Sequence, residues 1–433
     1  MSRTAIQRAH GTTDRPREGA PVVTVPRPRP GVLAPEDLVA RATALGTAFA
    51  ERAAHHDATG EPPAAQFEQL RAADLLRLTV ATADGGHGQG LATARAVVGA
   101  IARGDPSVAL ILAMHYSQHA ALARAGRGDG PGDWPQHAAR RLIEGTLSGL
   151  ALVNAAQVEP ALGSPSHGGL PETVARRTPE GWRITGHKLY VTGAPLLSWI
   201  HVLARTDEAE PRLGSFLVPA DAPGVRIDPT WDPVGMRATA SHDVVFDQAL
   251  VPPGHAVGLR PAHLGLQRDA HGMAWYFSLV GTVYDGAARA ARDWLLAFLN
   301  ERRPSALGGA ALASLPTVQD AVGRIEVLLA ASDWLLRSHA QAYDAGTAPE
   351  GLAGVVKHTV VDHAVQAVAL AVELAGNHGL ARRNPLERHQ RNVLCSHIHA
   401  PPNSLLRGNA GRAALQSAQP GPLHAAAGTA PRH

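Results

Sequence analysis

The amino-acid sequence predicts a mostly helical protein with a small β domain in its middle. Apolar residues recur at helical spacing in the first third of the chain, for example at Leu38, Ala42, Leu45 and Phe49. The middle third instead contains short β-branched runs that are separated by turn residues. Long alanine-rich stretches with helical periodicity then return. The order of helical domain, antiparallel β domain and helical bundle is uncommon, so it narrows the possible folds.

These changes of pattern divide the chain into five segments. Residues 1–34 are rich in Arg, Pro and Thr and lack the apolar stretch of a signal peptide, so we expect a flexible leader. Residues 35–145 are predicted to form the N-terminal helical domain, residues 146–260 the middle β domain, and residues 261–415 the helical bundle. Residues 416–433 are rich in Ala, Gly and Pro, which predicts a disordered tail.

The individual elements follow from the same patterns. Short runs of β-branched and aromatic residues are predicted as strands at 174–177, 182–185, 189–192, 199–204, 215–218, 225–228 and 242–246. Stretches with small residues on one face are predicted as long antiparallel helices at 281–300, 317–343, 354–374 and 403–415. Residues 84–90 are too glycine-rich to be helical and would form either an interhelical turn or a substrate-facing loop.

Composition argues against several classes of function. The formal net charge is only +3 over 433 residues and no basic tract is concentrated, which argues against nucleic acid as a partner. Cys395 is the single cysteine, which excludes an internal disulfide and a multi-thiolate metal site. No run approaches the roughly 20 apolar residues that span a bilayer. We therefore expect a cytoplasmic protein with no membrane span and no metal site.

Three motifs of the β domain carry more specific information. They are Val158-Glu159-Pro160-Ala161-Leu162-Gly163-Ser164, then Gly186-His187-Lys188-Leu189-Tyr190-Val191-Thr192-Gly193-Ala194, then Gly235-Met236-Arg237-Ala238-Thr239-Ala240-Ser241. In this order and spacing they resemble the acyl-CoA dehydrogenase family, and the resemblance covers about residues 35–415. It implies that family's fold: an N-terminal α-helical domain, a middle antiparallel β domain and a C-terminal four-helix bundle.

The resemblance also implies a homotetramer in which each subunit binds one FAD between the β domain and the bundle. By position, Thr192 would hydrogen-bond flavin N5, where a donor stabilises the reduced ring as hydride arrives. Tyr190 would pack against the isoalloxazine in place of the usual tryptophan, with Val191 between them. The loop that approaches flavin and substrate closely would contain Glu159, Pro160, Gly163 and Ser164, because small residues permit such an approach.

A second group of positions would reach the FAD of a neighbouring subunit. Arg302 stands where the family places an arginine that contacts the pyrophosphate, a task suited to its forked donors. Gly376 and Gly379 retain the glycines of the family's dinucleotide loop. Glu373 replaces the usual glutamine, and an acid near a pyrophosphate is unfavourable, so we assign it no contact.

The catalytic base of the family is missing. An acyl-CoA dehydrogenase uses a carboxylate to remove a proton beside the thioester carbonyl, but the two positions known for it fall on Ala400 and near Tyr276. His399 lies beside the vacant position and is an acceptable base near neutral pH, which makes it the candidate. His397, a carboxylate from elsewhere, or a different flavin chemistry remain as alternatives.

Three functions therefore follow as hypotheses. The first is α,β-dehydrogenation of an acyl thioester by hydride transfer to flavin N5, with electrons passed to an electron-transfer partner. The second is a two-component monooxygenase that takes reduced flavin from a flavin reductase, activates oxygen at flavin C4a and oxidises a small organic substrate. Arg391 and Asn392, followed by His397 and His399, are similar to the pattern of that branch. The third, a catalytically silent binding or assembly module, is disfavoured by the retained flavin-side residues.

Overall fold

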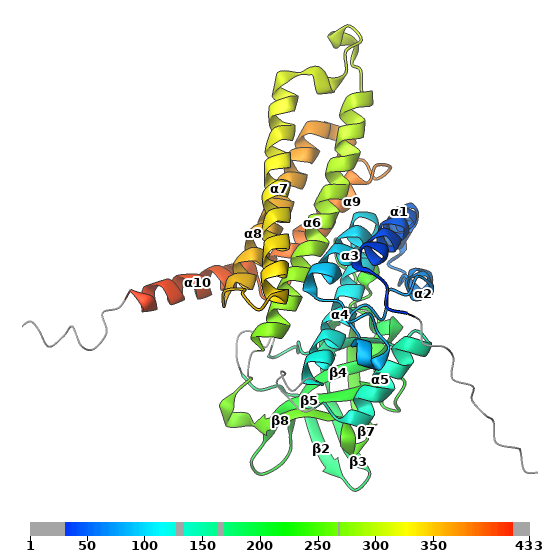
Figure 1. The fold of residues 1–433 in the computed structure, drawn as a ribbon, viewed down its shortest axis with the longest axis vertical. Coiled ribbons are helices and arrows are strands. Elements are labelled where there is room, and N and C mark those ends of the chain that lie inside the picture. Colours follow the sequence, from blue (N-terminus) through cyan, green and yellow to red (C-terminus); the bar gives the residue numbers. More distant parts are fainter. Residues whose placement is uncertain (1–30, 127–133, 163–168, 267–268, 419–433) are drawn as a thin grey trace, which may run out of the picture. The chain divides into compact units, whose positions relative to one another are not determined.

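The computed structural model describes residues 31–126, 134–162, 169–266 and 269–418 (Figure 1). Most of the expected leader and tail lie outside the described residues, as do Gly163 and Ser164. The order of helices, sheet and helices that the sequence predicts is confirmed.

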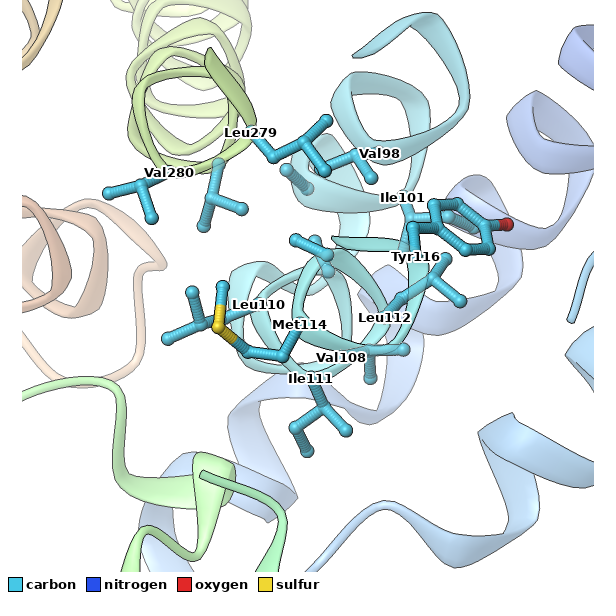
Figure 2. Close-up of a cluster of buried hydrophobic side chains, with 14 of the residues drawn as sticks. Val98, Ile101, Val108, Leu110, Ile111, Leu112, Met114, Tyr116, Leu279 and Val280 are labelled. Atoms are coloured by element: carbon cyan, nitrogen blue, oxygen red, sulfur yellow. The ribbon is translucent and has the colours of Figure 1, made fainter. Parts of the chain in front are cut away.

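The N-terminal helices are α1 (Pro35–Thr59), α2 (Ala64–Ala72), α3 (Leu91–Gly104), α4 (Pro106–Ala125) and α5 (Gln136–Ser148). Helix α4 begins at the Asp105 cap, whose carboxylate accepts from the Ser107 backbone N–H at 2.8 Å. Its first half is buried on every side. Figure 2 shows Leu110 and Met114 of α4 near Val280 of α6, within a buried cluster that α3 also joins. This helix therefore forms the centre of the helical core.

Eight strands form one sheet in the middle of the chain. They are β1 (Leu152–Ala156), β2 (Val174–Thr178), β3 (Gly181–Val191), β4 (Leu197–Thr206), β5 (Arg212–Pro219), β6 (Val225–Asp228), β7 (His242–Val251) and β8 (Ala256–Pro261). The strand order is β6-β7-β3-β2-β4-β5-β8, and β1 pairs with β4. The sheet is mostly antiparallel, as predicted, and β1 and β2 both run parallel to β4.

The sequence patterns located most strands but missed two. The predicted runs 182–185 and 189–192 belong to the single strand β3. Strands β1 and β8 were not predicted, because neither alternates strongly between apolar and polar side chains.

The C-terminal helices are α6 (Ala270–Glu301), α7 (Pro316–Asp344), α8 (Leu352–Ala375), α9 (Leu386–Leu394) and α10 (Asn403–Ser417). The three long helices pack on one another, and α9 packs against α6 and α8. Helix α9, which the sequence did not predict, completes a four-helix bundle. Helix α10 packs on α8 and leaves most of its surface exposed (Figure 1).

Helix α8 is the most apolar of the long bundle helices. Together with the turn that follows, it forms a segment, Leu352–His378, that is long and apolar enough to cross a membrane by length and composition alone. Its buried residues, such as Val360, Ala364 and Val368, recur at helical spacing and pack against the other bundle helices. That pattern is typical of the central helix of a bundle.

The N-terminal domain and the bundle are joined by an acid at the end of α7. Both carboxylate oxygens of Asp344 accept hydrogen bonds at 2.8 Å, from the backbone N–H groups of Leu91 and Ala92. A Cβ at Gly90 would collide with this carboxylate. The glycine-rich segment before α3 is therefore an interhelical turn whose end is fitted to the bundle, and Asp344 acts as a tertiary N-cap.

Candidate functional site

The end of strand β3 presents Tyr190 and Thr192 beside a loop of the β domain. The pairing of β3 with β7 shifts register between Lys188 and Val191, and Tyr190 adopts a left-handed backbone conformation with φ of 58°. As a result the Tyr190 ring is 59% exposed, with its centroid 6.1 Å from that of Trp231. Val191, by contrast, is fully buried, so its side chain is not available to a cofactor.

The backbone after Tyr190 is held from both sides. The Thr192 carbonyl accepts from the Asn154 side-chain amide at 3.0 Å, and the Gly193 N–H donates to the Thr239 carbonyl at 2.8 Å. A Cβ at Gly193 would press on the Ile111 side chain of α4. The half-buried Thr192 hydroxyl is therefore presented from a rigid turn.

Glu159 has a different environment from the one the resemblance implies. Its carboxylate lies 2.6 Å from the Lys188 ammonium, and both side chains are almost completely buried. Burial alone would raise the pKa of Glu159, but hydrogen bonds from Lys188 and Thr173 hold it below its usual value. Its side chain therefore anchors the loop to β3, and Pro160 is the exposed residue of the pair. A contact from Glu159 to a cofactor would have to come from its backbone.

His399 lies in an aromatic pocket of the bundle. Its ring centroid is 5.9 Å from those of both Tyr276 and Tyr284, and its Nδ1 lies 2.9 Å from the Tyr284 hydroxyl oxygen. Burial, together with the nearby Lys357 ammonium, lowers the pKa of His399 to about 3. The imidazole is therefore neutral at neutral pH.

The partner of His399 determines which nitrogen carries the proton. Burial raises the pKa of Tyr284 well above its usual value, so its hydroxyl keeps its hydrogen. Among the described residues His399 is the partner of that hydroxyl, and donation to Nδ1 satisfies it. The hydrogen of the neutral ring then lies on Nε2, so His399 offers a donor rather than a free basic nitrogen.

The acids near this loop do not replace the missing base. Ala400 and Tyr276 occupy the two expected positions. Asp362 faces His397 with 3.6 Å between carboxylate oxygen and Nε2, but both side chains are at least 40% exposed. This acid lies at the surface and not in the aromatic pocket, so it is a poor substitute.

Lys357 fixes the loop that carries His399. Its buried ammonium donates to the carbonyls of His399 and Pro401, both at 3.1 Å, to the Asn403 side chain at 3.2 Å, and to the Ser396 carbonyl at 3.4 Å. Burial lowers its pKa to about 8. Sequence reasoning missed this role, although the signal was visible: the chain contains only two lysines, Lys188 and Lys357, and both are fully buried.

One loop of the β domain connects the two halves of the candidate site. The Asn392 side chain of α9 accepts from the Met236 N–H at 2.7 Å, and Arg391 donates to the Val234 carbonyl at 2.8 Å. The same loop carries Thr239, which holds the backbone after Thr192. Segment 391–399 and the end of β3 are thus docked on residues 231–241.

Arg302, Gly376 and Gly379 lie elsewhere in the bundle. Arg302 is exposed at the end of α6, and the loop with the two glycines is close to it, because the His378 ring lies 5.0 Å from Phe298. Tyr284, the partner of His399, stands on α6 about 27 Å away along the helix axis. One subunit does not bring these residues to His399.

The described residues form a cleft among the helices and another on the β domain, and Thr192 and His399 line neither of these two. The larger, of about 710 Å³, lies between α1, α3, α6 and α7 and is edged by paired charges such as Arg289 and Asp285. The smaller, of about 580 Å³, borders Pro160 and His187. We therefore define the candidate site by its contacts.

The residues at the end of β3 fit a planar cofactor such as flavin. An exposed aromatic ring gives an apolar surface for a flat group, and the neighbouring Thr192 hydroxyl gives one polar contact at its edge.

Three domain models of one protein family match the chain. The acyl-CoA dehydrogenase N-terminal domain matches residues 38–129, the middle domain matches residues 155–249, and the C-terminal domain matches residues 279–415.

Individual proteins are similar over most of the chain. The putative acyl-CoA dehydrogenase YdbM of Bacillus subtilis is 32% identical over 357 residues, which cover 82% of this chain and 90% of that protein. L-evernosamine nitrososynthase of a Micromonospora species is 30% identical over 273 residues, 61% of this chain and 62% of that protein. The structure of KijD3 in complex with FMN and dTDP-3-amino-2,3,6-trideoxy-4-keto-3-methyl-D-glucose has a TM-score of 0.78 at 27% identity, covering 89% and 94% of the two chains.

Proposed function

The chain belongs to the acyl-CoA dehydrogenase family, and from that premise we propose that it is a flavin-dependent monooxygenase that oxidises a small organic substrate. The flavin would lie against Tyr190 with its N5 edge toward Thr192. FAD fits the family, and Arg302, Gly376 and Gly379 are the residues we propose for its pyrophosphate, supplied by a neighbouring subunit of a homotetramer.

The observation that carries this proposal is the state of His399. Dehydrogenation of an acyl thioester requires a base that binds a proton at working pH. An imidazole whose pKa is lowered to about 3, and whose Nδ1 already accepts from Tyr284, is a weak base. The same ring is well suited to donate its Nε2 hydrogen to a negative charge that develops beside Tyr276 and Tyr284.

Reduced flavin, when bound, supplies the two electrons that activate dioxygen. The residues of this chain would have three tasks around it. Tyr276 and Tyr284 exclude water, His399 presents a single N–H, and Thr192 contacts the flavin edge. The nitrososynthase and the KijD3 complex, which contains FMN and an amino sugar nucleotide, support flavin chemistry on a polar substrate at this fold.

Dehydrogenation is the second candidate, because a relative that is 32% identical over 82% of this chain is named a putative acyl-CoA dehydrogenase. This function would require a proton acceptor other than the acids and histidines of the pocket described above. The electron acceptor would then be an electron-transfer partner instead of dioxygen.

Two measurements on the FAD-loaded protein separate the candidates. Anaerobic titration with acyl-CoAs of different chain length should leave the flavin spectrum unbleached. With NADH, a flavin reductase and dioxygen, a panel of amines and aromatic heterocycles should contain a compound that gains one oxygen atom, detected by mass spectrometry. Bleaching by an acyl-CoA without another reductant would overturn the proposal in favour of dehydrogenation.

A further inference from the structure

Three hydroxyl groups form a chain that begins at Thr192. The Thr192 Oγ1 lies 3.0 Å from the Ser241 Oγ, which lies 2.8 Å from the Thr239 Oγ1. The Thr239 hydroxyl in turn donates to the Met236 carbonyl at 2.9 Å. Thr239 and Ser241 are buried, with 0% and 3% of their surface exposed, while Thr192 is half-buried. The chain therefore connects the protein interior to the edge of the candidate site.

The Met236 carbonyl, the last acceptor, fixes the direction of every hydrogen bond between the three hydroxyl groups. A carbonyl oxygen can only accept, and a hydroxyl has one hydrogen to donate. Because Thr239 gives its hydrogen to the Met236 carbonyl, it must accept from Ser241. Ser241 has then used its own hydrogen and must accept from Thr192. The Thr192 hydroxyl consequently has no hydrogen left and presents only lone pairs to the site.

The Met236 carbonyl, at which the chain of hydroxyl groups ends, is held firmly enough to keep the hydrogen bonds in this direction. The Met236 N–H donates to the buried Asn392 side chain at 2.7 Å, and the Met236 carbonyl also accepts from the Trp231 indole at 3.2 Å. Met236 has a left-handed backbone conformation with φ of 55°. Turning this carbonyl away would break several contacts at once, so it remains a fixed acceptor.

We propose that Thr239 and Ser241 are positioning residues that make the Thr192 hydroxyl a hydrogen-bond acceptor, so that the site prefers reduced over oxidised flavin. This inference rests on the proposed flavin position. Reduced flavin carries a hydrogen on N5, which an acceptor can bind, whereas oxidised flavin has a lone pair there that faces the lone pairs of Thr192. The Thr192 hydroxyl would thus accept a hydrogen bond from flavin N5, whereas the family resemblance implies that it donates one.

A preference for reduced flavin suits an enzyme that receives its flavin from a reductase. The site would capture the reduced cofactor and release the oxidised one more readily. By linkage, a site that binds the reduced form more tightly also raises the midpoint potential of the bound flavin. Affinity and potential are therefore two independent measurements of the same effect.

The test compares dissociation constants of oxidised and dithionite-reduced FAD for the full-length apoprotein, measured anaerobically by calorimetry. Wild type should bind reduced FAD more tightly. In Ser241→Ala the Thr192 hydroxyl no longer donates to Ser241, so its hydrogen can point at N5. The dissociation constant of oxidised FAD divided by that of reduced FAD should then fall about tenfold. A tenfold change in this ratio corresponds to a midpoint potential about 30 mV lower. Thr239→Val, which removes the fixed direction while preserving volume, should change the ratio in the same sense.

Ser241→Thr retains the hydroxyl and should keep the wild-type ratio. Ser198→Ala provides a matched deletion outside the chain, because the Ser198 hydroxyl donates to the Leu150 carbonyl, and it should also leave the ratio unchanged. An unchanged ratio in folded Ser241→Ala or Thr239→Val protein would overturn the inference. If wild type binds neither form of FAD, the proposed flavin function itself is wrong. A shifted ratio in a protein that dehydrogenates acyl-CoAs would support the hydroxyl chain and remove the monooxygenase proposal.

Discussion

Tyr284 determines which nitrogen of His399 faces the candidate site. With Tyr284 donating to Nδ1, the imidazole is held in one orientation and one tautomer. A histidine prepared in this way has a single N–H to offer, and it does not titrate near neutral pH because burial lowers its pKa to about 3. The hydrogen-bonding capacity of His399 therefore depends on Tyr284.

Tyr284→Phe tests this coupling. The substitution removes a hydrogen bond of about 1 kcal/mol, so His399 becomes free to turn. We therefore expect about fivefold less oxygenated product per NADH consumed, with correspondingly more hydrogen peroxide. Both products are measured in the assay coupled to the flavin reductase. Tyr343→Phe is the matched control, because its hydroxyl contacts the exposed His271. Equal product yields in the two variants would show that Tyr284 does not orient the histidine.

At the scale of elements, Lys357 joins helix α8 to the loop before α10. Its four acceptors include three backbone carbonyls, so the loop conformation depends on one ammonium group. Within the described residues this ammonium has no carboxylate partner, which makes its burial costly unless each of its three hydrogens is donated to one of these four acceptors. The loop and the lysine therefore stabilise each other.

Lys357→Met should lower the free energy of unfolding by about 3 kcal/mol, because it leaves several buried acceptors unsatisfied. The measurement is urea denaturation followed by circular dichroism. Val355→Ala, at a half-exposed position of the same helix, should change stability by less than about 0.5 kcal/mol. A similar small effect in both variants would contradict the role of Lys357.

The sequence predicted the elements better than their contacts. Strands and helices follow from local periodicity, and Thr192 and Tyr190 could be selected because they belong to motifs in register. The tautomer and the lowered pKa of His399 could not be predicted from the sequence. They depend on Tyr284, which is 115 positions away in the chain, and on how α6 packs against the loop that contains His399. Helix α9 was missed because it is short and mostly polar.

For the whole molecule, the separation of Arg302 from His399 gives a prediction about assembly. If a neighbouring subunit supplies Arg302, Arg302→Ala should raise the dissociation constant for FAD about tenfold and leave that for FMN unchanged, because FMN lacks the pyrophosphate. The adjacent Arg303, which donates to backbone carbonyls of α6, is the control. Light scattering should report a tetramer, and a monomer that binds FAD tightly would contradict the arrangement.

Buried histidines give the whole fold a pH dependence. Burial lowers the pKa of His115 to about 4 and that of His389 to about 3, whereas in the unfolded chain such groups bind protons near pH 6.5. Between these values the unfolded state binds more protons, so the free energy of unfolding decreases as the pH falls from about 6.5 toward 4. The urea midpoint should be lower at pH 5 than at pH 7. His115→Asn should weaken this dependence, and exposed His263→Asn should not.

The burial of both lysines has a practical consequence for chemical modification. The folded chain has no accessible ε-amino group, since Lys188 and Lys357 are its only lysines and both are fully covered. An amine-reactive dye should therefore leave both ε-amino groups of the native protein unmodified. Lys188 should become reactive only when the β domain opens and Lys357 only when the bundle opens, so the dye found on each lysine would report the opening of its own domain.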